Sequence, residues 1–454
     1  MAARDLGIEN RAPVQVQNPG PAAVATIVRE IALSRLLIAY AVAGLVFMLL
    51  PGTFLGVWNL LSISSHEAAH AIAPAWLQAH GHAQVFGWVG TFILGIGFHS
   101  IPRLRNQRYP LWKPWATLSL WTAAIALRWF SSVYGWHWRL VLPLAGAVEI
   151  VAFLIFFSVV AGHRSPKRNG LDAWVKVVIV ATLGFFSALI LNFAFSLDAA
   201  LHSATPAFPP QLDARFLPVL SWGFLVPFVW GFSARWLPVF LGLKDPKAKG
   251  LAAALAFNSA GVVLAASLGP RSPRSTLIAA VLLLLGAIFA ACSLHVAVAA
   301  EKPAKVKGVH PSFPWFVRSA YGWLLISGML GIWAALDDRS GGIGGASRHA
   351  LTVGFVALMV FNIGQRVLPA FGGMRLLFSP RLMLAASALL TLGCALRVSS
   401  EVLAYQHYAA WAWHVLPVSA VIELSAVMLL AVNLLVTFLK PPPVAAVDVK
   451  QFAD

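Results

Sequence analysis

"HAQVFGWVGTFILGIGFHSIP" at residues 82–102 and "HALTVGFVALMVFNIGQRVLP" at residues 349–369 align without a gap at a constant offset of 267 residues. The identical pairs are His82/His349, Ala83/Ala350, Gly87/Gly354, Val89/Val356, Ile96/Ile363, Gly97/Gly364 and Pro102/Pro369. Each stretch is a mostly apolar run of about 20 residues, which is the length that crosses a bilayer as a helix. The pair therefore predicts a duplicated membrane helix with a histidine at the same position in both copies.

The duplication continues into the segments that follow each helix. "ALRWFSS" around Arg128 mirrors "ALRVSS" around Arg397, and "VLPLAGAVEI" with Glu149 mirrors "VLPVSAVIEL" with Glu423. Three consecutive helices thus repeat at nearly one spacing, which is the sequence signature of repeated structural units.

A weaker middle copy lies between the two. "PVLSWGFLVPFVWGFSARWLP" at residues 218–238 keeps the glycine and the final proline, but Pro218 stands at the histidine position. We predict an all-α membrane bundle of three four-helix repeats with pseudo-threefold symmetry, in which the first and third keep the histidine. The expected repeats cover about 32–162, 174–298 and 315–439.

Composition agrees with a polytopic membrane protein. Of the 454 residues 59% are hydrophobic and 11% charged, and 18 are Trp and 29 Phe, which lies far from the average soluble domain. About twelve runs are long and apolar enough to span: 32–51, 80–101, 115–133, 138–162, 174–197, 216–241, 250–268, 275–298, 315–335, 347–370, 380–400 and 411–439. Short loops favour one transmembrane domain over 32–441, between tails at 1–31 and 442–454.

The net charge of +17 has a topological explanation. Most Lys and Arg fall in the segments that share a side with the N-terminus if the chain crosses the membrane twelve times. The positive-inside rule then places both termini in the cytoplasm. The basic charge is therefore a topology signal and does not indicate nucleic-acid binding.

The two cysteines, Cys292 and Cys394, lie far apart in apolar runs. They form no CxxCH haem-attachment motif and no thiolate iron–sulfur motif. Any haem must be held by non-covalent side-chain ligation.

His82 and His349 occupy equivalent positions near the expected outer ends of two helices, so they can face each other across a bundle. Two neutral imidazoles in an apolar shell are suited to the axial ligation of a b-type haem. Arg128 and Arg397 lie at a similar depth, where a charged side chain requires a partner, and haem propionates would supply one. The alternative for Arg397 is an ion pair with Glu401 one turn away.

Glu149 and Glu423 are expected near mid-membrane, where a carboxylate is paired or protonated. They suggest a proton path or a second polar site, and the alternative is an interhelical hydrogen bond.

"HEAAH" at residues 66–70 matches the HExxH zinc motif but offers no third ligand by spacing. His66, His70 and His80 could form an accessory copper or zinc site, with a solvated helical loop as the alternative. Protease chemistry is disfavoured, and no catalytic residue is assigned.

The histidine motifs resemble the NnrS family of haem- and copper-containing bacterial membrane proteins. Its HxHxxxFG signature is matched by residues 80–87, and its RHALTVG segment by residues 348–354. The resemblance implies an inner-membrane protein with haem b and, as a further cofactor, copper. It also implies a role in nitric oxide metabolism, denitrification and the response to nitrosative stress.

The same helices resemble subunit I of haem–copper oxidases and nitric oxide reductases, in which helices 2 and 10 carry the low-spin haem ligands. Carried over by position, His82 and His349 take those roles, with His80 as a spare ligand. The expected helices 6 and 7 lack histidine, and Ser347 stands where a second ligand of helix 10 would be. Oxygen reduction is therefore disfavoured.

The leading hypothesis is an NnrS-like haem protein whose partners are the lipid bilayer and either nitric oxide or a redox partner. Two alternatives remain: a haem-free transporter or metal-binding membrane protein, and a b-type electron-transfer subunit.

Overall fold

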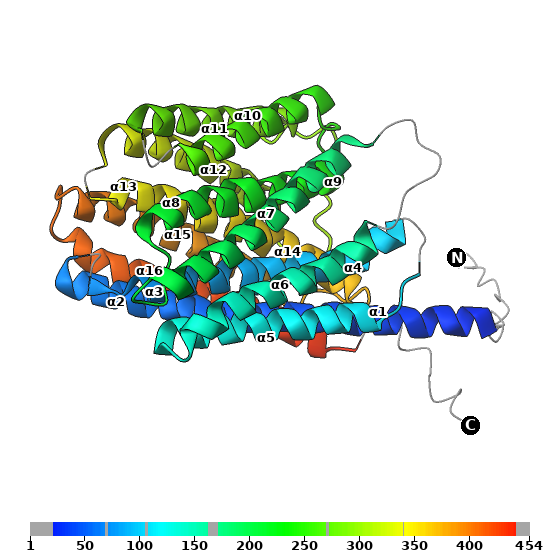
Figure 1. The fold of residues 1–454 in the computed structure, drawn as a ribbon. Helices are drawn as coiled ribbons and strands as arrows, with labels where there is room; N and C mark the ends of the chain where they lie inside the picture. Colours follow the sequence, from blue (N-terminus) through cyan, green and yellow to red (C-terminus); the bar gives the residue numbers. More distant parts are fainter. Residues whose placement is uncertain are drawn as a thin grey trace, which may run out of the picture.

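The computed structural model describes residues 21–68, 71–104, 108–161, 171–268, 272–338 and 340–441. All regular structure in these ranges is helical. It forms twelve long rods, several of which join an α-helix to a π-helical segment (Figure 1).

The first half of the chain contains the rods α1–η1–α2, α3–η3–α4, α5, α6, α7 and α8–η4–α9. Their bounds are α1 Pro21–Phe47, η1 Met48–Phe54, α2 Leu55–His66, α3 Pro74–His82, η3 Ala83–Gly90, α4 Thr91–Leu104, α5 Trp112–Tyr134, α6 Trp138–Val160, α7 Ala173–His202, α8 Pro210–Pro218, η4 Val219–Leu225 and α9 Val226–Leu241.

The second half contains α10, α11, α12, α13–η6–α14, α15 and α16. Their bounds are α10 Ala248–Ser267, α11 Pro273–Ser293, α12 Phe313–Asp337, α13 Gly342–His349, η6 Ala350–Ala357, α14 Leu358–Phe371, α15 Pro380–Tyr405 and α16 Ala412–Leu439.

Eleven of these rods are long and apolar enough to cross a membrane. The remaining rod, α5, carries Lys113 and Arg128, which lower its mean hydropathy, but its 23 residues equal α6 in length and the two helices pack together. The twelve predicted spans therefore correspond to twelve helical rods. Turn chemistry explains several boundaries: Gly135 and Gly242 end α5 and α9 with φ of +67° and +68°, which favour glycine.

Burial identifies the centre of the bundle. The rods at Pro74–Pro102, Pro210–Leu241 and Gly342–Phe371 are buried over 89%, 72% and 72% of their most apolar window, whereas the other candidate spans reach at most 50%. These are the three rods that the sequence repeat relates. They therefore form the axis of the bundle, and the other helices separate them from lipid.

The same three rods share an unusual feature. Each contains a π-helical segment, and the segments η3, η4 and η6 begin directly after His82, Pro218 and His349. These three residues are the ones that the sequence alignment places in register. Because π-helical segments are rare and concentrate at functional sites, their coincidence supports the threefold repeat.

Two predicted boundaries are wrong. The first rod does not stop near residue 51: η1 accommodates Pro51 in its π-helical turn, and the helix continues to His66. The "HEAAH" sequence therefore begins with His66, the last residue of α2. The second rod begins at Pro74, a favourable first helical residue, so His80 and His82 lie inside the helix, about 10 Å from its start at 1.5 Å per residue.

Candidate functional site

A cavity of about 390 Å³ is lined by residues from α2, α3, α8 and α13, among other helices. These four helices lie toward one end of the bundle in Figure 1. Its volume is in the range of ligand-binding pockets. The sequence-predicted residues that line it are His80, His82, His349, Arg128, Arg397 and Glu423. The structure thus brings together side chains from helices that are far apart in the sequence.

His349 has a well-defined orientation. Its Nδ1 lies 2.9 Å from Glu401 Oε2 and 3.0 Å from the carbonyl oxygen of Gly345. Its Nε2 lies 3.5 Å from an amino group of Arg397. Metal-binding histidines commonly donate one ring N–H to a carboxylate or carbonyl, which orients the other nitrogen toward the metal. His349 has this arrangement.

The imidazole of His80, which also lines the cavity, is oriented in the same way. Its Nδ1 lies 2.9 Å from the carbonyl oxygen of Gly52, within the π-helical segment of the first rod. Its Nε2 has no hydrogen-bond partner in the part of the chain that the structure describes. The ring rests on Gly56, where an added Cβ would lie 2.7 Å from His80 Cε1. Gly56 therefore provides the space that the imidazole occupies.

His82 has different surroundings. It is 6% exposed, and its Nε2 lies 3.0 Å from Glu149 Oε1 on α6. Glu149 is fully buried, and its Oε2 accepts a hydrogen bond of 2.9 Å from Asn192 on α7. The Asn192–Glu149 hydrogen bond joins α7 to α6 and is the interhelical hydrogen bond given as the alternative for Glu149. His82 Nε2 and Glu149 Oε1 lie close together but have no hydrogen-bond partner among the described residues.

The two arginines are buried at the cavity and incompletely paired. Arg128 is 4% exposed and donates to Ser196 Oγ at 2.8 Å, while its Nε has no partner among the described residues. Arg397 is 7% exposed and its Nε lies 3.5 Å from Glu401 Oε2, while its NH1 has no partner within the same residues. The predicted Arg397–Glu401 contact is present, and donors remain at both arginines for an anionic group.

Glu423 and Glu149 differ despite their equivalent sequence positions. Glu423 lines the cavity, and its Oε1 has no hydrogen-bond partner in the described ranges. Glu149 instead lies behind His82. The two carboxylates therefore do not form one symmetric path.

The predicted accessory metal site of His66, His70 and His80 lies partly outside the described residues. His66 is exposed and its Nδ1 lies 2.8 Å from the carbonyl oxygen of Ser62, whereas His80 lines the cavity. His70 lies outside the described residues. Within those residues no group of three or more His, Cys, Asp or Glu side chains could hold a metal ion.

Ser347 lies on α13, two residues before His349, at the position expected for a second ligand, and its side chain bonds to a neighbouring helix. Its hydroxyl donates to the carbonyl oxygen of Ser327 on α12 at 2.9 Å. The position therefore serves helix packing here.

Sequence reasoning missed several residues of the site. It paired Glu401 with Arg397 but not with His349, and it did not identify Gly52, Gly56 or Asn192. Glu401 is one turn from Arg397 and could have been found by spacing. The other three act through contacts between distant helices, which no spacing or motif in the sequence indicates.

The chain resembles known proteins in sequence and in fold. A search of functionally curated proteins finds no match. Among solved structures, a chain of a heme-copper terminal oxidase dimer is similar, with a TM-score of 0.66 and 13% identity over 90% of this chain and 84% of that chain. At this identity the similarity shows a common fold alone. The sequence model of the NnrS protein family matches residues 34–441. Because this match spans nearly all of the helical bundle, the chain belongs to the NnrS family.

Proposed function

We propose that this chain is a b-type haem protein of the bacterial cytoplasmic membrane that acts in nitric oxide metabolism and the response to nitrosative stress. The observation that carries the proposal is the cavity, where three histidines meet two buried arginines with unpaired donors. The family and the heme-copper oxidase fold support a membrane haem protein. The nitric oxide role follows from the family alone.

The residues of the cavity fit haem. His349 and His80 each have Nδ1 held by a carbonyl oxygen, and His349 also by Glu401, so both can offer Nε2 to iron. His82 has its Nε2 directed to Glu149. We therefore favour His80 and His349 as the axial pair, with His82 as a supporting residue or an exchange ligand. Arg128 and Arg397 would bind the propionates, because guanidinium groups pair well with carboxylates.

When bound, haem iron would supply one-electron redox chemistry and affinity for nitric oxide. The chain holds the imidazoles in fixed rotamers, neutralises the propionates and excludes water with aromatic side chains. Two of these aromatic residues, Trp88 and Phe361, line the cavity and lie 6.1 Å apart between ring centroids. His80 and His349 would both hold the iron, so nitric oxide would have to compete with one of these histidines in order to bind.

The direct test is the optical spectrum of the purified, reduced protein together with its haem and copper content. Soret and α bands with haem b at one per chain support the proposal. A colourless protein would contradict it and favour a haem-free transporter. Stoichiometric copper in the purified protein would support an accessory copper site at His66, His70 and His80.

Nitric oxide separates the remaining alternatives. If the proposal is right, adding nitric oxide to the reduced protein converts the low-spin spectrum into that of a nitrosyl complex. An unchanged low-spin spectrum would indicate an electron-transfer subunit, because its iron would be inert to the gas.

A further inference from the structure

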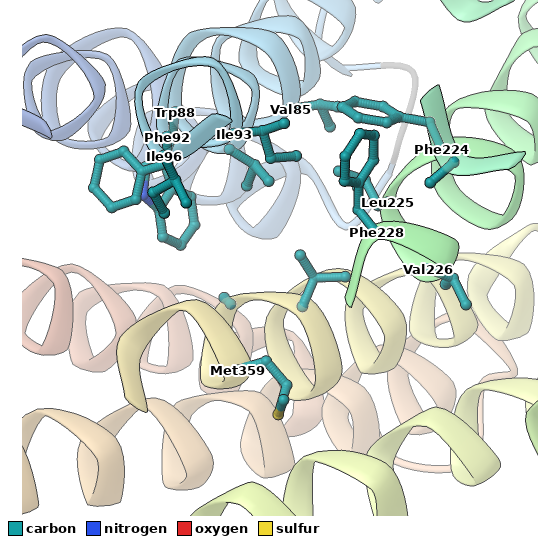
Figure 2. Packing of buried hydrophobic residues seen from close by; sticks show 14 of the residues in the cluster. Val85, Trp88, Phe92, Ile93, Ile96, Phe224, Leu225, Val226, Phe228 and Met359 are labelled. Carbon is teal, nitrogen blue, oxygen red and sulfur yellow. The ribbon is translucent and has the colours of Figure 1, made fainter. Parts of the chain in front are cut away.

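A second cavity lies deeper on the axis of the bundle. It has a volume of about 70 Å³ and is lined by residues of η3 and α4, of η4 and α9, and of α14. Figure 2 shows part of this packing: Ile96 lies beside Phe92, Leu225 lies beside Phe228, Ile93 lies between these two groups, and Met359 lies on another rod. The cavity is therefore formed by the three helices that the repeat relates.

The lining of this axis cavity is almost wholly apolar. Of its fifteen lining residues, Ser233 and Trp236 are the two with a polar side-chain atom. A buried water needs a volume of about 10–15 Å³ and 2–4 polar partners. The axis cavity has the volume but lacks the partners. It is suited to a small apolar occupant and not to water.

Gly364 maintains this space. A Cβ added there would meet one atom within 4 Å, Leu368 Cδ1 at 3.8 Å. Its repeat mate Gly97 is different, because a Cβ there would lie 2.7 Å from Phe156 Cε2. Gly97 thus serves helix packing, whereas the missing side chain of Gly364 leaves room on the axis.

The axis cavity adjoins the histidine cavity. Leu225 lines both. Trp88 lines the histidine cavity, and its ring centroid lies 6.3 Å from that of Phe92, which lines the axis cavity. Because Leu225 contacts both cavities, a change in its rotamer would connect the two spaces.

We propose that the axis cavity binds uncharged diatomic molecules such as nitric oxide and passes them to the histidine cavity. Such molecules are apolar enough to enter from the bilayer and match an unhydrated apolar space. The binding of a diatomic molecule depends on the axis cavity alone, whereas its delivery to the histidine cavity depends on the proposed haem function.

Xenon tests the binding step without any need for haem. Crystals of the purified full-length protein are pressurised with xenon and compared with Gly364→Leu, which fills the space, and Gly364→Ala, which narrows it. Gly322→Leu is the matched control, because Gly322 is exposed on α12 with no atom within 4 Å of an added Cβ. Xenon density in the axis cavity, reduced in Gly364→Ala and lost in Gly364→Leu but kept in the control, is expected. No density there, or equal density in all variants, would overturn the proposal.

Flash photolysis of the nitrosyl haem complex tests delivery. We expect Gly364→Leu to slow the capture of nitric oxide from solution and to remove a fast rebinding phase, while Gly322→Leu behaves as the parent. Unchanged kinetics in Gly364→Leu would overturn the delivery role. Loss of haem in the parent would instead contradict the proposed function and leave the xenon result intact.

Discussion

At the scale of single residues, His80 and His82 show what spacing can and cannot predict. Residues two apart on a helix point to nearly opposite faces, so the sequence could name both as ligands but could not choose between them. The choice depends on neighbours: Gly52 and Gly56 contact His80, whereas Glu149 lies against His82.

Glu401 is expected to tune the proposed haem through His349. The carboxylate lies 2.9 Å from His349 Nδ1, and its negative charge stabilises the oxidised iron through the ligand. Glu401→Gln should keep haem but raise its midpoint potential, on the order of 60 mV for a tenfold change in a one-electron couple. Redox titration measures this. Asp198→Asn, which removes an exposed carboxylate 3.1 Å from His202, is the control, and an equal shift in both variants would refute the assignment.

Glu149 is expected to support the fold. Removing one partner of a buried hydrogen bond typically costs about 1–3 kcal/mol, so Glu149→Ala should lower thermal stability clearly. Glu149→Gln should retain most of it, because an amide can still accept from Asn192. Thermal unfolding in detergent checks both variants. Equal stability of Glu149→Ala and the parent would show that the chain of polar contacts is not structural.

At the scale of elements, the repeat predicted the helices more reliably than it predicted their ends. The apolar runs identified all twelve rods, since span length is set by bilayer thickness. The extension of the first rod past Pro51 escaped prediction because a proline normally interrupts an α-helix, and the π-helical turn that absorbs it depends on packing. The π-helical segments after His82 and His349 were likewise not visible in the sequence.

The contact between α2 and α3 gives a prediction at this scale. Gly56→Ala would put a methyl group 2.7 Å from His80 Cε1 and so displace the imidazole or the helix. We expect a several-fold lower haem content per chain, measured by the pyridine haemochrome method. Gly322→Ala, at an exposed site on α12, should load normally. Full loading of Gly56→Ala would mean that His80 is not a ligand.

At the scale of the whole molecule, three related rods enclose two successive spaces on one axis. The histidine cavity carries charged and imidazole side chains in its wall, whereas the axis cavity is lined almost wholly by apolar side chains. The sequence predicted the threefold arrangement and the meeting of His82 with His349 in one region. It could not predict either cavity, because a cavity is what remains after side chains from several distant helices have packed.

The central claim is that His80 and His349 hold iron between them. Electron paramagnetic resonance of the oxidised protein tests it most directly, because it reports whether ferric haem is low-spin with two strong axial ligands or high-spin with one. The parent and His82→Ala should give a low-spin signal, whereas His80→Ala and His349→Ala should turn high-spin or lose haem. A high-spin signal in His82→Ala together with an unchanged low-spin signal in His80→Ala would contradict the account.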